Sequence, residues 1–509
     1  LFHNLSPPVF IPKLLLVFPS HHRRISFLTK ASRGDSNSLS PVPSCQITPS
    51  FIIRILLPSL KASSISCVIN TIVIPVLNVQ PYIRECLDSV VNQTLTDIEI
   101  FCIDAGSIDG TLEIEQEYAK KDSRITILDD TAHSTGYAKN LGFQRANGKY
   151  MAIVESDDYI ALDMMEKLYN AAEQNELDIV KGNYRSFLGE GGARLFVEKA
   201  VSLNQEDYGK VIDPQSDNRF FGWDMYTWTG LYRKAFLEKY HILHNESKGA
   251  AFQDVGFWFQ TFCYARRVYL LSDYFYHYRR DNPNASVKNP NRTFIMCDEY
   301  RFIKDKISRD TPTWNRVLPA YYHELFRSYF VTYERLAEQL KPDFAAQFYM
   351  EMRNGYKLGY VHRGLFDDYE LKYLDILLQS KQAFMDRLAT QKQNAEQKRQ
   401  QLYEKIREHE NCIIFSAGSH GCNLQVMLKQ CFDRNVAAFC DNSLKKNGKC
   451  INGVRILNLR EAIQYYPDAV YLIANKKYSV EIHRQLLDSG IDEVHIIPCR
   501  VEELIDGFL

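Results

Sequence analysis

Three carboxylates lie close together at Glu155, Asp157 and Asp158, directly after an apolar, strand-like run over residues 150–154. Carboxylates this close repel one another unless a cation or solvent compensates their charge. Hard cations such as Mn²⁺ or Mg²⁺ take oxygen ligands and share them with phosphates, so the cluster could hold a metal beside a phosphorylated ligand. It could equally cap the helix expected over residues 162–172, because aspartate is favoured there. Spacing alone leaves both interpretations open.

A pair of arginines, Arg279 and Arg280, follows another apolar strand-like run over residues 268–271. Guanidinium groups match the geometry of phosphate oxygens, so the pair suits a diphosphate. For either arginine taken alone, a solvated surface charge is an equal alternative.

The elements that must position these groups alternate between strand and helix. β-Branched and apolar runs predict strands over 68–75, 98–103, 125–128 and 150–154, and amphipathic spacing predicts helices over 81–91, 109–119 and 138–146. This alternation predicts right-handed βαβ units and a mostly parallel sheet. Ligands bind beyond the carboxyl ends of such strands, where Asn78, Asp104 and the acidic cluster fall.

Composition places limits on the class of protein. A chain of 509 residues predicts two or three domains, and its net charge of −1 argues against a nucleic-acid-binding partner. Its apolar runs are too short for a membrane helix, although peripheral membrane contact stays open. The 12 cysteines show no zinc-binding spacing, and several lie in strand-like runs, which favours reduced thiols and a cytoplasmic location.

Four stretches differ in character. Residues 1–66 are basic, rich in serine and proline and without clear periodicity, so we expect a disordered or spurious leader, with a transit peptide as the alternative. Residues 67–290 contain the alternating elements. Residues 291–410 predict a helical extension that ends in a polar linker helix. Residues 411–509 predict a second, small Rossmann-like α/β domain.

The small domain carries an incomplete dinucleotide-binding pattern. The sequence Ser416-x-Gly418-x-x-Gly421 follows a predicted strand but lacks the first glycine of that pattern. Asp441 lies where a ribose-binding acid would be expected. Nucleotide binding and a purely structural or regulatory role both remain open.

Two blocks of the chain carry a family resemblance. The segment VIPVLNVQPYIRECLDSVVNQTLTDIEIFCIDAGSIDGT resembles the opening of family 2 glycosyltransferases, and YAKNLGFQRANGKYMAIVESDDYI resembles their second block. The resemblance extends to about residue 290. It implies a GT-A fold, a nucleotide-sugar donor, a divalent cation and inversion at the anomeric carbon. The small domain resembles accessory domains that follow some bacterial transferases.

The resemblance assigns the nucleotide-sugar side of the site. It places Pro75 and Asn78 at the turn where the nucleotide docks, and Asp104 where the base and ribose are held. Ala105 replaces the second acid of that pattern, which puts part of the base recognition in doubt. Lys139 stands where the family has arginine, near the phosphates.

The resemblance also assigns the metal and the reacting groups. Glu155-Ser156-Asp157 falls on the Asp-x-Asp motif, with Asp157 as the metal ligand and Asp158 beside it. Gln253-Asp254 resembles a Glu-Asp motif whose aspartate would be the general base. Without the resemblance, a helix cap is the more ordinary role for Asp254. Trp228 could stack on a sugar, and a core position is as plausible.

The sequence therefore predicts an inverting, metal-dependent glycosyltransferase with a nucleotide-sugar donor. The resemblance implies a glycan or lipid-linked glycan acceptor, as in the synthesis of bacterial surface polysaccharide or lipopolysaccharide, at the inner face of the membrane. The changes at Ala105, Glu155 and Gln253 leave a degenerate nucleotide-sugar-binding protein without turnover as the alternative. An oxidoreductase built on the small domain is disfavoured by its defective glycine loop. The donor sugar and the oligomeric state are not predicted.

Overall fold

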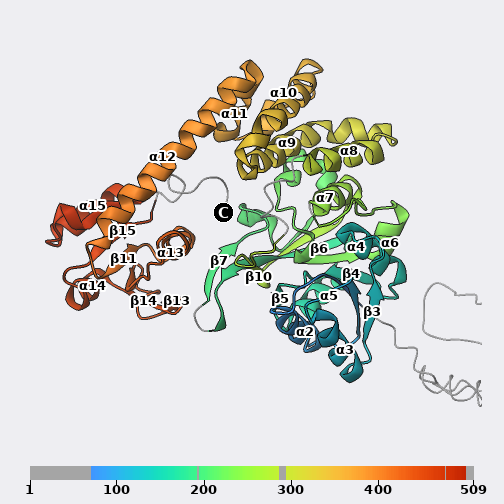
Figure 1. The fold of residues 1–509 in the computed structure, drawn as a ribbon, viewed down its shortest axis with the longest axis horizontal. Coiled ribbons are helices and arrows are strands. Elements are labelled where there is room, and N and C mark those ends of the chain that lie inside the picture. The colour runs from blue at the N-terminus through green and yellow to red at the C-terminus, as the bar shows by residue number, and fades with distance from the viewer. Residues whose placement is uncertain (1–69, 192–193, 251, 286–293, 476, 500–509) are drawn as a thin grey trace, which may run out of the picture. The chain divides into compact units, whose positions relative to one another are not determined.

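The computed structural model describes residues 70–191, 194–250, 252–285, 294–475 and 477–499. The predicted leader over residues 1–66 lies outside them. Among the described residues, two sheets have ten and six strands, and helices join and flank them (Figure 1). The predicted α/β class is confirmed.

The larger sheet has the strand order β3-β2-β1-β4-β9-β6-β10-β5, with β7 beside β6 and β8 beside β10. Its strands are β1 (Asn70–Val76), β2 (Ile98–Asp104), β3 (Ile125–Asp129), β4 (Tyr150–Ile153), β5 (Tyr159–Ile160), β6 (Ile179–Leu188), β7 (Leu195–Lys199), β8 (Val211–Ile212), β9 (Gly230–Arg233) and β10 (Val268–Arg279). The β3-β2-β1-β4 half is parallel, as predicted. The other half is mixed, because β9 runs antiparallel to both of its neighbours.

Strand order explains which face each helix covers. The helices of this part are α2 (Ile83–Val91), α3 (Thr111–Lys121), α4 (Thr135–Arg145), α5 (Met164–Gln174), α6 (Lys234–Lys239) and α7 (Gln253–Tyr264). The chain moves outward from β1 to β3 through α2 and α3, then returns to β4 through α4. Right-handed crossovers therefore put α2 and α3 on one face and α4 on the other. Every residue of β1 is buried, as expected for a central strand covered on both faces.

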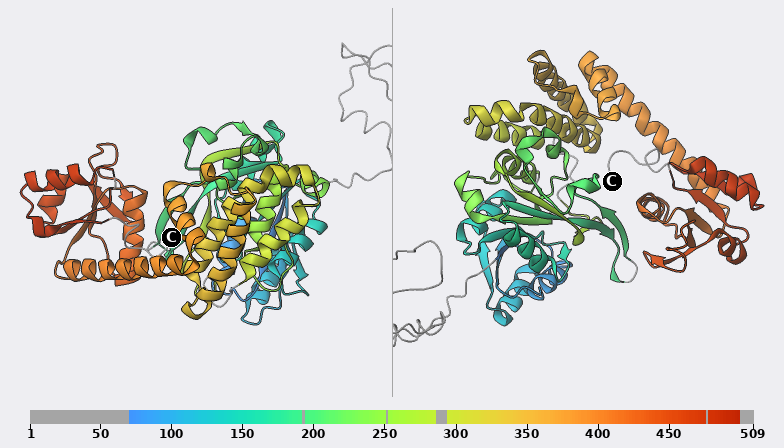
Figure 2. Two further views of the ribbon diagram at one scale, coloured as in Figure 1. Left: turned by 90° about the horizontal axis from the view of Figure 1, so that it is seen from above. Right: turned by 180° about the vertical axis from the view of Figure 1, so that it is seen from behind.

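In the described part of the chain, five α-helices lie between β10 and the second sheet: α8 (Ile295–Ile307), α9 (Thr311–Arg335), α10 (Lys341–Lys357), α11 (Asp368–Gln379) and α12 (Lys381–Arg407). Helix α8 packs on α7 and α9, and α9 packs on α10 (Figures 1 and 2). One hydrophobic core runs from Ile72 in β1 to Leu388 in α12. The predicted boundary after residue 290 therefore does not coincide with a break in the core.

The second sheet has the order β13-β14-β12-β11-β15-β16 and is parallel apart from the β13–β14 pair. Its elements are β11 (Cys412–Phe415), α13 (Ser419–Phe432), β12 (Ala438–Cys440), β13 (Cys450–Ile451), β14 (Val454–Leu457), α14 (Leu459–Tyr465), β15 (Val470–Ile473), α15 (Ser479–Asp488) and β16 (Ile496–Pro498). Two core clusters of its own cover its faces. Within the described part of the chain, no helix combines the length and apolar character needed to span a membrane.

Candidate active site

The turns after β1 and β2 are hydrogen-bonded to each other at the carboxyl edge of the sheet. Asn78, in the left-handed region at φ 50°, accepts a hydrogen bond at Oδ1 from the amide of Ile108 at 2.9 Å. Its own amide donates to the Ser107 hydroxyl at 2.9 Å. Asp104 accepts at Oδ1 from the amides of Gly106 and Ser107, both at 2.8 Å. Both predicted nucleotide-side residues therefore shape one double turn.

Two features of this double turn differ from what the motif suggests. Pro75 is buried inside β1, paired in register with Ile103, so it lies beneath the turn rather than in it. Asp109 ties the turns together, because it accepts from the amide of Gln80 at 3.0 Å and from that of Thr111 at 3.0 Å. The sequence pattern predicts for Asp109 only a position at the start of a helix. The other buried oxygen of Asp104, Oδ2, has no hydrogen-bond partner among the residues that the structure describes.

Asp158 is held inside the protein. It is 1% exposed and accepts from the Tyr276 hydroxyl at 2.8 Å and from the amide of Arg279 at 2.7 Å. Burial and the charge of Asp157 raise the pKa of Asp158 well above its ordinary value. Both of its oxygens thus fasten the acidic loop to β10, which is a structural role rather than the metal-binding role predicted from the sequence.

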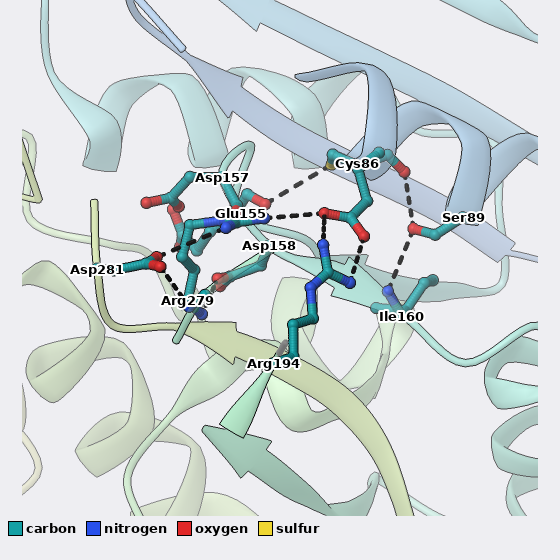
Figure 3. A network of polar contacts seen from close by, with 11 residues as sticks. Cys86, Ser89, Glu155, Asp157, Asp158, Ile160, Arg194, Arg279 and Asp281 are labelled. Carbon is teal, nitrogen blue, oxygen red and sulfur yellow. Dashed lines mark hydrogen bonds and ion pairs between the residues drawn. The ribbon is translucent and has the colours of Figure 1, made fainter. Parts of the chain in front are cut away.

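Arg279 is also committed to the fold (Figure 3). It is 4% exposed, its Nε donates to the main-chain oxygen of Asp157 at 2.9 Å, and its Nη2 pairs with Glu85 at 2.8 Å. Glu85 also pairs with Arg194 at 2.7 Å, and Asp281 lies 3.5 Å from Arg279. The diphosphate contact predicted for Arg279 does not fit this arrangement, because the buried guanidinium is already bonded to the main chain of the acidic loop and to Glu85.

Arg280 differs from its neighbour. Its guanidinium lies 5.4 Å from the centre of the Tyr278 ring, it is half-buried, and no ion pair is found for it among the described residues. Of the two predicted arginines, Arg280 is therefore the one whose charge remains available to an anion.

Lys139 joins the two halves of the predicted site. Its Nζ lies 2.9 Å from Glu155 Oε1 and 2.6 Å from Asp254 Oδ1, and its side chain is 2% exposed. Glu155 follows β4 and Asp254 is in the first turn of α7, and the ammonium that joins them belongs to a lysine 115 positions before Asp254. The predicted phosphate contact of Lys139 is replaced here by a bridge between two carboxylates.

The bridge determines how these groups titrate. Burial alone would lower the pKa of Lys139, but the charges of Asp254 and Glu155 raise it above its ordinary value. Burial would raise the pKa of Asp254, but the charge of Lys139 lowers it below its ordinary value. Asp254 is therefore ionised at neutral pH, as a general base must be. For Glu155, burial prevails and raises the pKa.

Local sequence explains why Lys139 reaches this position. Ser134 caps α4 by accepting from the amide of Tyr137. Gly142 lets the helix approach β1, because a Cβ at this position would lie 2.6 Å from Val73. Asn140 donates to the main-chain oxygen of His244 at 3.0 Å and so fixes the segment that leads to α7.

Gln253 shows why an amide replaces the acid of the Glu-Asp motif. Its Nε2 donates to the main-chain oxygens of Ser247 and Gly249, at 3.3 and 3.0 Å. A carboxylate cannot donate to these oxygens. The departure from the family pattern therefore follows from a different hydrogen-bonding role.

Trp228 lies in the core. It is 2% exposed, and its ring stacks on Tyr276 at 4.0 Å and on Tyr226 at 4.7 Å. Of the two roles considered for it, the structure favours the core position over stacking on a sugar.

Comparison with known proteins assigns the larger part of this site to a family. The family model described as glycosyl transferase family 2 matches residues 71–252. This segment is therefore similar to family 2 glycosyltransferases, and we call it the family 2 domain. A second model, described as C2185-like, N-terminal, matches residues 408–497 in the small domain.

Relatives of the family 2 domain cover part of the chain. It is 35% identical over 225 residues to the uncharacterized glycosyltransferase EpsJ of Bacillus subtilis, which is 43% of this chain and 63% of EpsJ. It is 31% identical over 224 residues to the poly(ribitol-phosphate) beta-glucosyltransferase of Bacillus spizizenii, 43% of this chain and 33% of that protein. The chain thus spans less than two thirds of either relative.

Among solved structures, S. aureus TarS 1-349 is 18% identical, with a TM-score of 0.37, over 57% of this chain and 92% of that one.

The family 2 match contains four of the predicted site residues, Asn78, Asp104, Lys139 and Asp157. Asp254 lies just beyond the end of the match.

Asp157 provides the oxygen chemistry that a divalent cation needs in this family 2 domain. Its Oδ2 accepts from Asn282 at 2.7 Å, and the residue is partly exposed. Burial raises the pKa of Asp157. Among the described residues, no three His, Cys, Asp or Glu side chains are grouped to hold a metal. Asp157 therefore fits a cation that takes its remaining ligands from phosphates and water.

In the small domain, the predicted ribose-binding acid forms hydrogen bonds with the glycine loop and with its own segment. Asp441 accepts from the amides of Ala417 and Ser443, both at 2.9 Å, and from Lys446 Nζ at 3.0 Å. Both carboxylate oxygens of the predicted ribose-binding acid are therefore engaged within the chain.

Proposed function

We propose that this chain transfers a sugar from a nucleotide-sugar donor to a hydroxyl group of a glycan acceptor, with inversion at the anomeric carbon. The family 2 domain supports the reaction class. The observation that carries the proposal is the bridge from Glu155 through Lys139 to Asp254, which links the donor motif to an ionised base.

In the proposed reaction, Asp254 accepts the proton of the acceptor hydroxyl. The acceptor oxygen forms a bond to the anomeric carbon as the bond from that carbon to the diphosphate breaks, and the nucleoside diphosphate leaves with the electron pair. A single base and direct displacement give inversion. The lowered pKa of Asp254 keeps it unprotonated at neutral pH, and Lys139 orients the carboxylate.

Negative charge develops on the leaving diphosphate, so groups of opposite charge should lie beside it. We assign this role to Arg280 and to a divalent cation, Mn²⁺ or Mg²⁺, held by Asp157. The cation, when bound, would offset charge on the phosphate oxygens. Asn78 and Asp104 shape the turn on which we place the nucleotide.

The acceptor is proposed from the kind of polymer that a relative modifies. The Bacillus spizizenii relative is named as acting on poly(ribitol phosphate). We propose a surface glycan or lipid-linked glycan as the acceptor class and a cytoplasmic reaction, with peripheral contact to the membrane where the acceptor is lipid-linked.

A second candidate is a nucleotide-sugar-binding protein without turnover. The observation that favours it is the occupation of Asp254 Oδ1 by Lys139, which a productive base has to share with the acceptor hydroxyl. The two candidates agree on donor binding and differ in product formation.

The test uses the full chain with Mn²⁺ and UDP-, GDP- and dTDP-sugars, with and without acceptor glycans. Released nucleoside diphosphate and glycosylated acceptor are both measured. Transfer from one donor class that is lost in Asp157→Asn, in Asp254→Asn and on chelation supports the enzyme. Asp305→Asn, which removes an exposed carboxylate on α8, is the matched control. Donor binding without product for every acceptor would favour the binding protein.

A further inference from the structure

Helix α7, which carries Asp254, follows a residue that cannot cap it with its side chain. The residue before it, Phe252, has φ 62° and offers no side-chain acceptor. The first amides of a helix lack partners within the helix, so a buried helix start needs an acceptor from elsewhere. Any imprecision in this first turn would displace Asp254, its second residue.

Glu299 of α8 supplies that acceptor. Its Oε1 accepts from the amide of Gly256 in α7 at 3.0 Å, and its Oε2 accepts from Asn245 Nδ2 at 2.9 Å. The carboxylate is 1% exposed, although it lies 45 residues after Asp254 in the sequence. A single buried group thus fixes both the first turn of α7 and the segment that leads into it.

Gly256 makes this contact possible. A Cβ at position 256 would lie 2.1 Å from Glu299 Oε1, far inside any permitted contact. A glycine in the interior of a helix costs roughly 0.5–1 kcal/mol relative to alanine. Its presence here is explained by the close approach of the carboxylate.

We propose that Glu299 is a positioning residue for Asp254, and that helix α8 is therefore part of the catalytic unit rather than an appendage to it. The proposal rests on the function proposed above. It adds a required residue from outside the family 2 match, which ends at residue 252. Glu299 acts through the backbone of α7, and nothing places it against the substrate.

The electrostatic setting agrees with this role. Burial raises the pKa of Glu299 to about 8, and the charge of Asp254 contributes in the same direction. A carboxyl group can accept amide hydrogen bonds whether it is protonated or ionised, so the contact with Gly256 does not depend on this titration. Glutamine at this position keeps one acceptor oxygen for Gly256, so it should largely preserve the geometry.

The experiment compares Glu299→Ala and Glu299→Gln in the full chain, with Asp305→Ala as a control for loss of an acidic side chain from α8. We expect Glu299→Ala to lower kcat on the order of 10²-fold, the effect of a misplaced reacting group, with little change in KM for the donor. Glu299→Gln should recover most of that loss. Equal kcat values for Glu299→Ala and the wild-type chain would overturn the proposal.

Hydrogen exchange gives a readout that does not depend on turnover. In Glu299→Ala, amides of residues 253–256 should exchange about tenfold faster, while those of α5 stay unchanged. If the wild-type chain transfers no sugar, the proposed function fails, and this measurement still decides whether Glu299 holds the start of α7. Unchanged exchange at residues 253–256 would refute the inference alone.

A double-mutant cycle tests the contact itself. Gly256→Ala should disturb kcat by forcing the Glu299 carboxylate away. The double variant with Glu299→Ala should be no worse than Glu299→Ala alone, because the clash is then gone. Fully additive losses would mean that the two residues act independently, against the proposal.

Discussion

Replacing Lys139 with methionine should raise the pKa values of the two carboxylates that it joins. Methionine keeps much of the side-chain volume but removes the ammonium group that lies 2.6 Å from Asp254 and 2.9 Å from Glu155. The two carboxylates would then face each other without a cation between them. Removing one partner of a buried ion pair is costly because the remaining charge is left uncompensated.

The distances set the size of the effect. Since one ammonium contacts both oxygens, these lie within about 5.5 Å of each other. At an effective dielectric constant of about 20, two charges at that separation repel by about 3 kcal/mol, equivalent to about two pKa units. In the wild-type chain the ammonium offsets this repulsion. Without it, at least one of the two carboxyls should hold its proton to a pH that is higher by about two units or more.

The pH dependence has a definite sign. In the wild-type chain the pKa of Asp254 is lowered, so its contribution to stability is present above its ordinary pKa and is lost as the pH falls. In Lys139→Met, the folded state is destabilised when both carboxyls are ionised, and this destabilisation is removed when one of them is protonated. The variant should therefore lie closest to the wild type near pH 4, and the difference in stability should widen by about 3 kcal/mol towards pH 7.

Thermal unfolding across this pH range measures the difference, and the acidic limb of the transfer rate should move to higher pH in parallel. Lys139→Arg, which keeps the cation, should behave like the wild type at both ends of the range. Lys149→Met removes an exposed lysine paired with Glu173 and should cost under about 1 kcal/mol at every pH. A destabilisation of Lys139→Met that does not change with pH would refute the reasoning.

Four further substitutions separate structural from chemical roles. Gln253→Glu should destabilise the start of α7 by about 1–3 kcal/mol in denaturant unfolding, because a carboxylate would face main-chain oxygens; an unchanged midpoint would contradict the assigned amide role. Trp228→Leu should lower stability by about 2–4 kcal/mol while leaving donor affinity in calorimetry near that of the wild type, whereas a selective loss of affinity would support sugar stacking. Arg279→Ala should lower the thermal midpoint of the free chain, and Arg280→Ala should instead weaken binding of nucleoside diphosphate; the reverse pattern would show that the arginine roles are exchanged.

Local periodicity predicted the elements well. The strand expected over 98–103 is β2, Ile98–Asp104, and the helix expected over 138–146 is α4, Thr135–Arg145. Continuous β-branched runs and helical spacing are local signals, so they predict elements without knowledge of tertiary contacts. The antiparallel insertion of β9 between β4 and β6 depends on long-range pairing, which periodicity does not report.

Residue types indicated the chemistry of the site but not the partners. Arg279 and Arg280 look equivalent in the sequence, yet one supports the acidic loop and the other is left for an anion. The bridge from Lys139 to Asp254 spans 115 positions, and Glu299 belongs to no motif, so neither could be found without the fold. In the sequence, Gln253 is only a departure from the Glu-Asp motif. Its hydrogen-bonding role could not be predicted, because its acceptors lie in a loop that no motif covers.

The attachment of the acidic loop to the end of β10 has a consequence for the order of folding. The loop that contains Asp157 and Asp158 is tied to Tyr276, Arg279 and Asn282, contacts that close 118 to 125 positions of chain. Such distant closures are slow to form compared with local ones. During synthesis on the ribosome, β1 to β4 can pair long before β10 exists. The loop should therefore become ordered in one late step, so that a chain released before residue 276 would fold its parallel strands and still lack a formed acidic loop.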